Sequence, residues 1–450
     1  MSPSSDNNKN KPTEKSSNHS LSNLLGASSF IFACRISGAG LAFLTQLLLA
    51  RWMGAYQLGI FFYAFSWMII LSTIIGIGYE SASFRVIGRA LSEQRYDLIR
   101  GFIIRGRQIL LSSGFITILL LGGILLSFDG IVNPDSQKTL LIALIIVPVY
   151  LIAVFHEAVS HAFSWFAMMA LPNIVIRPLL TLILVAITWY STGTLDAETV
   201  MSYQFIAMLT VVLIHYLLFR TKLTKEIGKP QPSFMTRSWV RIGIPQLVPV
   251  LFIGFLAEIN VVMVGFFLPP DQVAIFSIAF RVAMLISFMI FAVDSMFRPK
   301  AALFYADQDM PALQKLTSQS TQLMFWPGLF CVILFIVFGK FILGIFGEEF
   351  VAGYEIFALL ASSQLIIISI GPVASLLNVT GHQDYSMMVF GVALIILLIL
   401  DAILIPIFGM NGAAIAVVLV TAFWNIWMLI LVKRVLKIHP SVLSFAHEYK

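Results

Sequence analysis

The sequence has few charged residues. Asp, Glu, Lys and Arg make up 11% of the 450 residues, against roughly a quarter in soluble domains. Hydrophobic residues make up 59%, and the mean hydropathy is +0.93. A water-soluble chain of this length would divide into domains with polar surfaces, whereas apolar runs recur here along nearly the whole chain. The composition therefore excludes a soluble globular protein and predicts an all-α membrane protein.

Cysteines and enzyme signatures are also scarce. The two cysteines, Cys34 and Cys331, both fall within apolar segments, which excludes a disulfide framework and a paired-cysteine metal site. No Walker loop is present, which argues against ATP hydrolysis. His156, Glu157 and His161 come close to a zinc-protease motif, but the spacing separates the histidines by about 140° around a helix. They do not share a face, so we expect no metal and no cofactor.

Long apolar runs fill most of the chain. One run, 108–128, has 21 residues without a Lys, Arg, Asp or Glu. It would form about 30 Å of helix, enough to cross the hydrocarbon core of a bilayer. The sequence predicts twelve membrane helices, near 24–50, 58–83, 108–128, 139–160, 168–190, 199–219, 243–268, 273–297, 325–346, 354–378, 387–408 and 412–432.

The basic residues predict the orientation of these helices. Lys and Arg in short loops stay on the cytoplasmic side. With the N-terminus inside, 22 of the 28 basic residues are cytoplasmic, three are external (Arg51, Lys138 and Lys340) and three lie within helices. The net charge of +6 thus reflects topology, and we expect no nucleic-acid partner. We predict a multi-pass protein of the cell inner membrane, with both termini cytoplasmic and membrane lipids around it.

The two halves of the chain resemble each other. Residues 56–85 align with residues 271–298 with one two-residue gap, so that Gln57 pairs with Gln272. Six helices per half give both repeats the same orientation, as in transporters with a substrate path between two lobes; chance similarity of two helical hairpins is the alternative. The predicted regions are a disordered cytoplasmic tail (1–20), an N-terminal lobe (21–222), a cytoplasmic linker (223–241), a C-terminal lobe (242–435) and a cytoplasmic tail (436–450).

Three stretches also resemble a known family. Residues 47–91, 265–304 and 378–419, with their spaced Gly, Pro and hydrophobic residues, are similar to bacterial polysaccharide-biosynthesis flippases of the multidrug, oligosaccharidyl-lipid and polysaccharide exporter superfamily. The resemblance implies alternating-access movement of a polyprenyl-diphosphate-linked oligosaccharide from the inner to the outer leaflet. The products would be surface polysaccharides such as lipopolysaccharide O-antigen or exopolysaccharide, and a polymerase and a chain-length regulator are implied as partners.

Three arginines fall inside predicted membrane helices: Arg35, Arg177 and Arg281. An ionisable side chain at such depth costs about 3 kcal/mol on insertion scales, so it usually faces a cavity or a partner. Guanidinium groups match phosphate oxygens and stay protonated. We therefore predict that the three arginines bind the diphosphate or acidic sugars of the substrate; structural ion pairs or side chains extended to the interface are the alternative.

Acidic residues accompany these arginines. Glu258 in the seventh helix and Asp401 in the eleventh are predicted counter-ions, or sites that couple transport to H⁺ or Na⁺; structural pairing is the alternative. Four more charges lie at the cytoplasmic ends of the second and eighth helices and form a predicted gate, with plain salt bridges as the alternative: Glu80, Arg85, Asp294 and Arg298. Of these, Asp294 and Arg298 have the i,i+4 spacing of a helical ion pair.

Helix-breaking residues recur in the first and seventh helices, the first helix of each lobe. Gly38 and Gly40 lie in the first, and Pro245, Pro249 and Gly254 in the seventh. Paired irregular helices often mark a binding site in transporters and can bend during the transport cycle. We predict hinges at these positions, while close helix packing is the alternative use of the glycines.

Two other functions compete with a flippase. A cation-coupled multidrug exporter of the same superfamily would favour carboxylates in its cavity, whereas the deep charges here are mainly arginine. A membrane glycan polymerase or acyltransferase would need a sizeable catalytic loop. The external connections, such as 191–198 and 269–272, are short and carry no cluster of His and Asp. We therefore predict a transporter and not an enzyme.

Overall fold

The computed structural model describes residues 14–127, 133–244 and 247–442, and it contains no strand among them. The helices are α1 (Glu14–Ile75), α2 (Tyr79–Ser92), α3 (Tyr96–Ser127), α4 (Pro134–Ala162), α5 (Phe166–Ala170), η1 (Leu171–Ile176), α6 (Arg177–Thr192), α7 (Ala197–Ile227), α8 (Thr236–Gly243), α9 (Leu247–Phe267), α10 (Pro270–Ala283), η3 (Met284–Ile286), α11 (Ser287–Ala306), α12 (Met310–Gly344), η4 (Glu348–Gly353), α13 (Tyr354–Ile370), α14 (Val373–Val379), α15 (Gln383–Phe408) and α16 (Met410–Val435).

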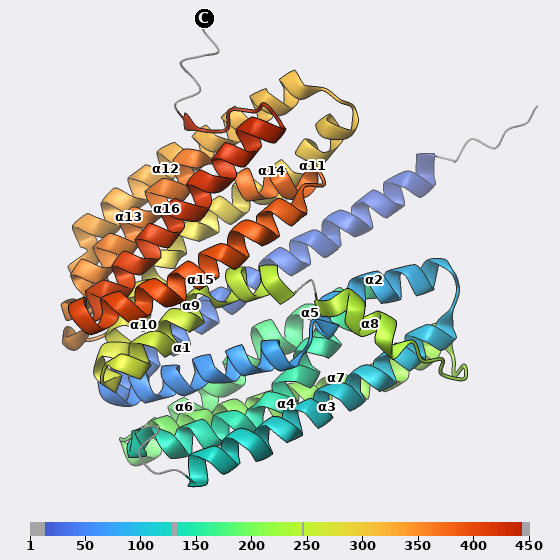
Figure 1. Ribbon diagram of the computed structural model, residues 1–450. Coiled ribbons are helices and arrows are strands. Elements are labelled where there is room, and N and C mark those ends of the chain that lie inside the picture. The colour runs from blue at the N-terminus through green and yellow to red at the C-terminus, as the bar shows by residue number, and fades with distance from the viewer. Residues whose placement is uncertain (1–13, 128–132, 245–246, 443–450) are drawn as a thin grey trace, which may run out of the picture.

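The helix count agrees with twelve membrane crossings. Ten stretches of the described residues are long and apolar enough to span a bilayer. One of them, Ala33–Ile75, contains Gly54 in a non-helical conformation (φ 71°, ψ 168°), and the chain doubles back there (Figure 1). This stretch therefore crosses twice. The 21-residue helix α9 supplies a further crossing, because it is about 30 Å long.

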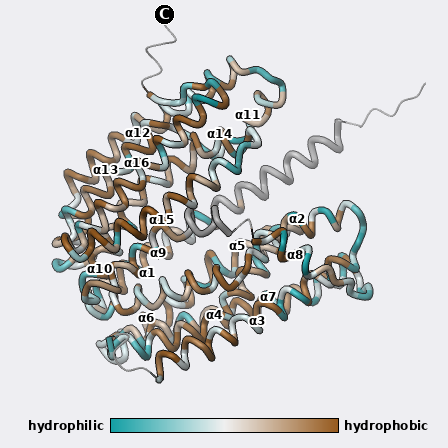
Figure 2. The backbone as a smooth tube through the Cα atoms, in the orientation of Figure 1, coloured by the Kyte–Doolittle hydropathy of each residue, from teal (hydrophilic) through white to brown (hydrophobic). Residues whose placement is uncertain are grey.

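The helices form two lobes. In Figure 1, α1–α8 make one bundle and α9–α16 the other; the bundles come together near α10 and diverge towards α2 and α11. Apolar residues cover the long helices of both bundles, and polar residues collect at their ends (Figure 2). Large apolar side chains on α3, such as Leu111, Phe115 and Leu119, are exposed. Such an exposed apolar surface suits contact with lipid and not with water. The chain is therefore a multi-pass, all-α membrane protein.

The connections between crossings define two ends of the molecule. We call the end that carries Gly54, residues 193–196, residues 268–269 and η4 the hairpin end. The opposite end carries residues 93–95, 163–165, 228–235, 307–309 and 380–382, and we call it the linker end. Most basic residues outside the spans lie at the linker end, as the sequence predicts for one face of the membrane.

The lobes are in contact at the hairpin end. The Arg51 Nε donates to the Ile345 carbonyl at 2.7 Å, and the Ala55 amide donates to Glu349 Oε1 at 2.7 Å. A Cβ on Gly59 would lie 1.6 Å from the Pro270 carbonyl oxygen, so only glycine permits this approach of α1 to α10. This end is therefore closed across the lobes.

Several helices begin or end away from their predicted boundaries. The first helix starts at Glu14, so residues 14–20, predicted to be a disordered tail, are helical, while residues 1–13 lie outside the described part. No proline interrupts the chain between Glu14 and the apolar run, so the helix continues beyond it. Helices α3 and α12 begin at Tyr96 and Met310, 12 and 15 residues before their predicted starts at 108 and 325, because their amphipathic first turns extend beyond the apolar segment.

The predicted hinges do not coincide with the helix breaks. Helix α1 runs without interruption through Gly38 and Gly40, and a Cβ on Gly38 would lie 2.6 Å from the Ile174 carbonyl oxygen. Gly38 therefore serves close packing, the alternative stated above. In the seventh helix, Pro245 lies outside the described residues, whereas Pro249 and Gly254 fall within the continuous helix α9.

The main break in the N-terminal lobe lies between α1 and α2. Ile77 and Gly78 both have positive φ, 50° and 68°. A Cβ on Gly78 would lie 2.2 Å from the carbonyl oxygen of Gly243, the last residue of α8. The close approach of these two backbones requires glycine, and it ties the break to the segment that joins the lobes.

The predicted linker packs on the N-terminal lobe. Helix α7 extends to Ile227, and α8 occupies residues 236–243. Arg100 donates to the Pro230 carbonyl at 2.7 Å, and the Trp239 ring packs edge-on against Phe102. The segment between α7 and α9 is thus part of the N-terminal lobe surface.

Candidate functional site

A cluster of charged residues joins the two lobes below the closed hairpin end. Arg281 on α10 and Glu258 on α9, both in the C-terminal lobe, approach to 3.5 Å. From the N-terminal lobe, the Ser66 hydroxyl on α1 donates to the Glu258 carboxylate, and the Phe62 ring lies 4.8 Å below the Arg281 guanidinium. Of the deep arginines, Arg281 is the one that lies within ion-pair distance of Glu258.

Arg281 is incompletely satisfied in this cluster. Its Nη2 is buried and makes no hydrogen bond to any described residue, and the ion pair with Glu258 is long for a charge-assisted bond. The side chain is 23% exposed. Arg281 follows the first residue of α10 by eleven positions, which is roughly 16 Å of helix and close to the middle of a bilayer. The nitrogen that faces Glu258 is thus the one that lacks a hydrogen bond, while part of the side chain stays accessible.

A second group of charges lies in the N-terminal lobe. Glu157 on α4 accepts a hydrogen bond from Asn173 Nδ2 at 2.5 Å. The Glu157 carboxylate lies within electrostatic range of both Arg177 and Arg35. Two of the three predicted substrate-binding arginines thus share one acidic neighbour. Asn173 belongs to η1, the π-helical turn directly before Arg177, and this turn places both side chains towards α4.

Arg35 also reaches towards the other lobe. Arg35 is exposed, and its guanidinium lies 5.7 Å from the centre of the Phe291 ring on α11. Arg35 precedes Gly54 by nineteen residues, roughly 28 Å of helix. It therefore lies deeper towards the linker end than Arg281, with Arg177 at a similar level at the start of α6.

The predicted gate residues divide between the lobes. Asp294 and Arg298 form the predicted i,i+4 ion pair at 2.6 Å, and Arg298 Nε also donates to the Ser375 hydroxyl at 3.0 Å. This pair is internal to the C-terminal lobe. Glu80 is exposed at the start of α2 and lies within electrostatic range of Glu157, and Arg85 follows one turn later.

Asp401 stands apart from all of these groups. It is fully buried in α15, and neither carboxylate oxygen has a hydrogen-bond partner among the described residues. Asn425 on α16 and Asn260 on α9 are also fully buried, and each has an amide oxygen without a described partner. Helices α9 and α16 both pack on α15. Three helices of the C-terminal lobe that pack on one another thus each bury a polar side chain whose oxygen lacks a described partner.

The histidine motif serves the interior of the N-terminal lobe. Arg107 Nε donates to His156 Nε2 at 2.9 Å, and the His156 ring stacks on Phe219. Glu157 points instead to Asn173, as described above. Among the described residues, no group of His, Cys, Asp and Glu is placed to hold a metal ion.

Comparison with known proteins shows to which protein family the chain belongs. The family model described as polysaccharide biosynthesis protein matches residues 24–296, more than half of the chain. The chain belongs to this family. Among characterised proteins, the chain is 26% identical over 405 residues to the probable low-salt glycan biosynthesis flippase Agl15 of Haloferax volcanii, covering 86% of this chain and 79% of that protein. These relatives are transporters, so the family member described here is not an enzyme.

Solved structures show the same fold. A multidrug resistance MATE transporter in an inward-facing conformation matches with a TM-score of 0.72 and 15% identity, covering 88% of this chain and 94% of the other. The lipid II flippase MurJ in an inward closed conformation matches equally well, with 14% identity over 91% and 87% of the chains. An outward-facing MATE transporter gives only 0.60, with 14% identity over 91% and 95%.

Some residues of the site escaped prediction. Ser66, Phe62 and Phe291 carry no charge, and only the packing of the lobes brings them to the arginines. Glu157 had a usable signal, because it is an acidic residue well inside an apolar segment, but it entered the prediction only through a metal motif. Its distance from the end of that segment could have placed it among the deep charges.

Proposed function

We propose that this protein is a flippase that moves a polyprenyl-diphosphate-linked oligosaccharide from the inner to the outer leaflet of the cell inner membrane by alternating access. The glycan-flippase role of the Haloferax relative and the fold shared with MurJ support the substrate class. The linker end would face the cytoplasm, because most basic loop residues lie there. A polymerase and a chain-length regulator would receive the product.

The incompletely bonded Arg281 is the observation that carries this proposal. A diphosphate supplies the paired acceptor oxygens that the Arg281 guanidinium lacks, since its Nη2 makes no hydrogen bond to a described residue. Glu258 already accepts a hydrogen bond from Ser66 of the other lobe. Arg35 and Arg177 lie nearer the linker end, so they would meet the diphosphate first. Transfer to Arg281 would then weaken its contact with Glu258 and loosen a connection between the lobes. The charges Glu80, Arg85, Asp294 and Arg298 would gate the cytoplasmic mouth.

Deletion of the gene tests the proposed function directly. Cells without this protein should accumulate lipid-linked oligosaccharide that a glycosidase or lectin reaches only from the cytoplasmic side. The wild-type gene should restore exposure on the outer side. Unchanged surface glycan together with a changed sensitivity to cationic drugs would contradict the flippase and favour a multidrug exporter.

We further propose that Asp401 couples transport to H⁺ or Na⁺. A buried carboxylate without a described partner is costly unless it takes up a proton or a cation. Asp401→Asn keeps the side-chain shape and should reduce glycan export by at least tenfold, with normal insertion in the membrane. Export measured in proteoliposomes should also lose its dependence on the imposed ion gradient. Full gradient-dependent export by Asp401→Asn would remove the coupling role.

A further inference from the structure

Arg107 on α3 carries a positive charge that no carboxylate among the described residues offsets. It directly precedes the uncharged run 108–128, which places it near the lipid headgroups on the side of the linker end. Its one described side-chain hydrogen bond runs from Nε to His156 Nε2 at 2.9 Å. Because that ring nitrogen accepts, the imidazole is neutral and does not offset the guanidinium. Both terminal NH₂ groups of this half-buried arginine therefore remain available to an anion.

Close packing of α3 on α4 fixes the position of Arg107. A Cβ on Gly106 would lie 2.5 Å from the Phe155 ring, so glycine permits the close approach of the two helices. The residues that follow these two in α3 and α4 then form the hydrogen bond described above. The guanidinium also lies 5.7 Å from the centre of the Phe219 ring and 6.0 Å from that of Tyr216, both on α7. The charge is thus held between α3 and α7, which both pack on α4.

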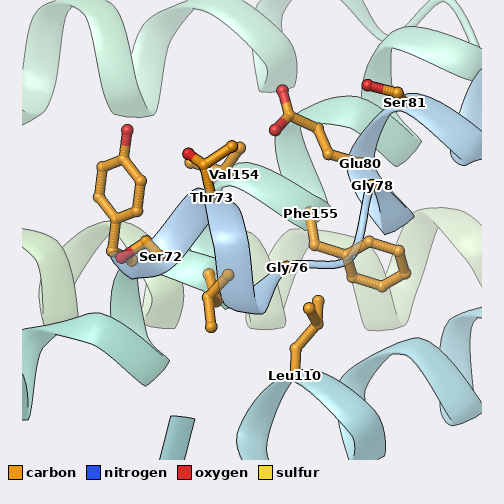
Figure 3. A pocket seen from close by; sticks show the side chains of 11 residues that line it. Ser72, Thr73, Gly76, Gly78, Glu80, Ser81, Leu110, Val154 and Phe155 are labelled. Atoms are coloured by element: carbon orange, nitrogen blue, oxygen red, sulfur yellow. The ribbon is translucent and has the colours of Figure 1, made fainter. Parts of the chain in front are cut away.

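Exposed apolar side chains continue from Arg107 along both helices towards the hairpin end. They are Leu111, Phe115 and Leu119 on α3 and Tyr216, Leu213 and Leu209 on α7. Figure 3 shows Leu110, the residue before the first of them, pointing into the lobe towards Phe155, and Leu110 is buried. The boundary between the interior and the lipid-facing surface therefore runs beside Arg107. We call the surface formed by Arg107 and these exposed residues the α3–α7 face.

The α3–α7 face is separate from the proposed substrate path. Helix α3 runs along the side of the N-terminal lobe that is farthest from α9–α16 (Figure 1). Arg35 and Arg281, in contrast, each lie against an aromatic ring of the opposite lobe, Phe291 and Phe62. A molecule that binds Arg107 would therefore come from the surrounding bilayer and not from the space between the lobes.

The chemistry of the α3–α7 face matches a phospholipid with a negatively charged headgroup. A guanidinium presents forked donors to phosphate oxygens, and the exposed apolar residues suit acyl chains. Arg220 is exposed one turn beyond Tyr216 on α7 and adds a second positive charge. The ion pairs of the described residues involve neither Arg107 nor Arg220. Two unpaired arginines favour an anionic headgroup over a zwitterionic one, whose ammonium group they would repel.

We propose that the α3–α7 face binds an anionic phospholipid from the leaflet at the linker end, with the phosphate on Arg107 and Arg220 and the acyl chains along α3 and α7. The lipid supplies the counter-ion that the described part of the chain does not provide for Arg107. This site is independent of the transported substrate, so its test does not depend on the proposed function.

Lipid binding to the purified full-length protein in detergent tests the site. The probes are phosphatidylglycerol, which is anionic, phosphatidylcholine, which is zwitterionic, and inorganic phosphate. Native mass spectrometry measures the affinity for each lipid, and thermal melting reports folding. The variants are Arg107→Gln, whose amide can still donate to His156, and Arg220→Gln. Arg95→Gln is the matched control, because it removes a positive charge from the first turn region of α3 that already pairs with Asp97.

The wild type should bind phosphatidylglycerol at least tenfold more tightly than phosphatidylcholine. Arg107→Gln should lose this preference, Arg220→Gln should reduce it, and Arg95→Gln should retain it. Inorganic phosphate should not displace phosphatidylglycerol, because it lacks acyl chains. Equal binding of the two lipids by the wild type, displacement by inorganic phosphate, or a full preference in Arg107→Gln would overturn the proposal. If Arg107→Gln does not fold, Arg220→Gln decides, because this exposed residue makes no described side-chain contact, and an unchanged preference there would equally refute the site.

Discussion

Replacing Arg281 with alanine is expected to abolish glycan export while the protein remains inserted and abundant in the membrane. Arg281 has a buried nitrogen without a described hydrogen-bond partner near mid-membrane. Hydrogen bonds to charged groups contribute about 1.5–3 kcal/mol, so loss of the guanidinium should weaken binding of polyprenyl diphosphate about 10- to 150-fold. Export is measured by surface glycan, and affinity with purified protein. Arg35→Ala should abolish export as well.

Three further variants separate binding from stability. Arg281→Lys keeps the charge but loses the forked geometry, so its affinity should fall between wild type and alanine. Glu258→Gln removes the competing carboxylate and should bind diphosphate at least as tightly as the wild type. Arg89→Ala, which removes an exposed arginine at the linker end, is the control and should export normally. Wild-type export by both Arg35→Ala and Arg281→Ala would refute the anion site.

The fold was predictable because lipid imposes one simple requirement. Every backbone polar group in hydrocarbon must be bonded internally, so long apolar runs such as 108–128 become helices, and their number fixes the topology. The first and last residues of each helix were less predictable, because a helix continues beyond its apolar segment until a helix-breaking residue or a turn ends it. Helix α1 reaches back to Glu14 for this reason. The break at Gly76–Gly78 had a visible signal in its two glycines, but hydropathy alone does not register it.

For the site, the sequence predicted only how deep in the membrane each charged residue lies. Sequence position placed Arg281 and Glu258 at similar levels in adjacent helices, which made their pairing a reasonable expectation. It could not show that Ser66 from the other lobe holds Glu258, because that contact depends on how two bundles pack. Arg35 and Arg177 looked independent in sequence, yet both lie within electrostatic range of Glu157. Neutral partners and shared neighbours are properties of tertiary packing, which periodicity does not encode.

The lobes are joined by two kinds of contact, and the difference bears on the transport cycle. At the hairpin end, backbone groups meet across the lobes, as in the bond from Ala55 to Glu349. Nearer mid-membrane, the contact is the ionic cluster of Glu258 and Arg281, which an anion can rearrange. Substrate would thus act on the ionic contact, while opening at the hairpin end requires the backbone contacts there to separate.

Gly59→Ala is therefore expected to shift the protein away from the state in which the hairpin end is closed. The new Cβ would lie 1.6 Å from the Pro270 carbonyl oxygen, a backbone atom that cannot rotate away. Overpacking of this kind costs about 1–3 kcal/mol, which corresponds to a change of about 5- to 150-fold in the ratio of the two states. Export should fall by a similar factor, because each cycle must close the hairpin end again.

Spin labels on Ser92→Cys and Asp307→Cys, in a background with Cys34 and Cys331 replaced by serine, report the separation of the lobes at the linker end. The labelled positions are exposed and lie on opposite lobes. Gly59→Ala should shorten this distance. Gly40→Ala is the matched control in the same helix, because its Cβ would meet nothing within 4 Å, and it should leave distance and export unchanged. An unchanged distance with normal export in Gly59→Ala would show that the hairpin-end contact does not control the conformational equilibrium.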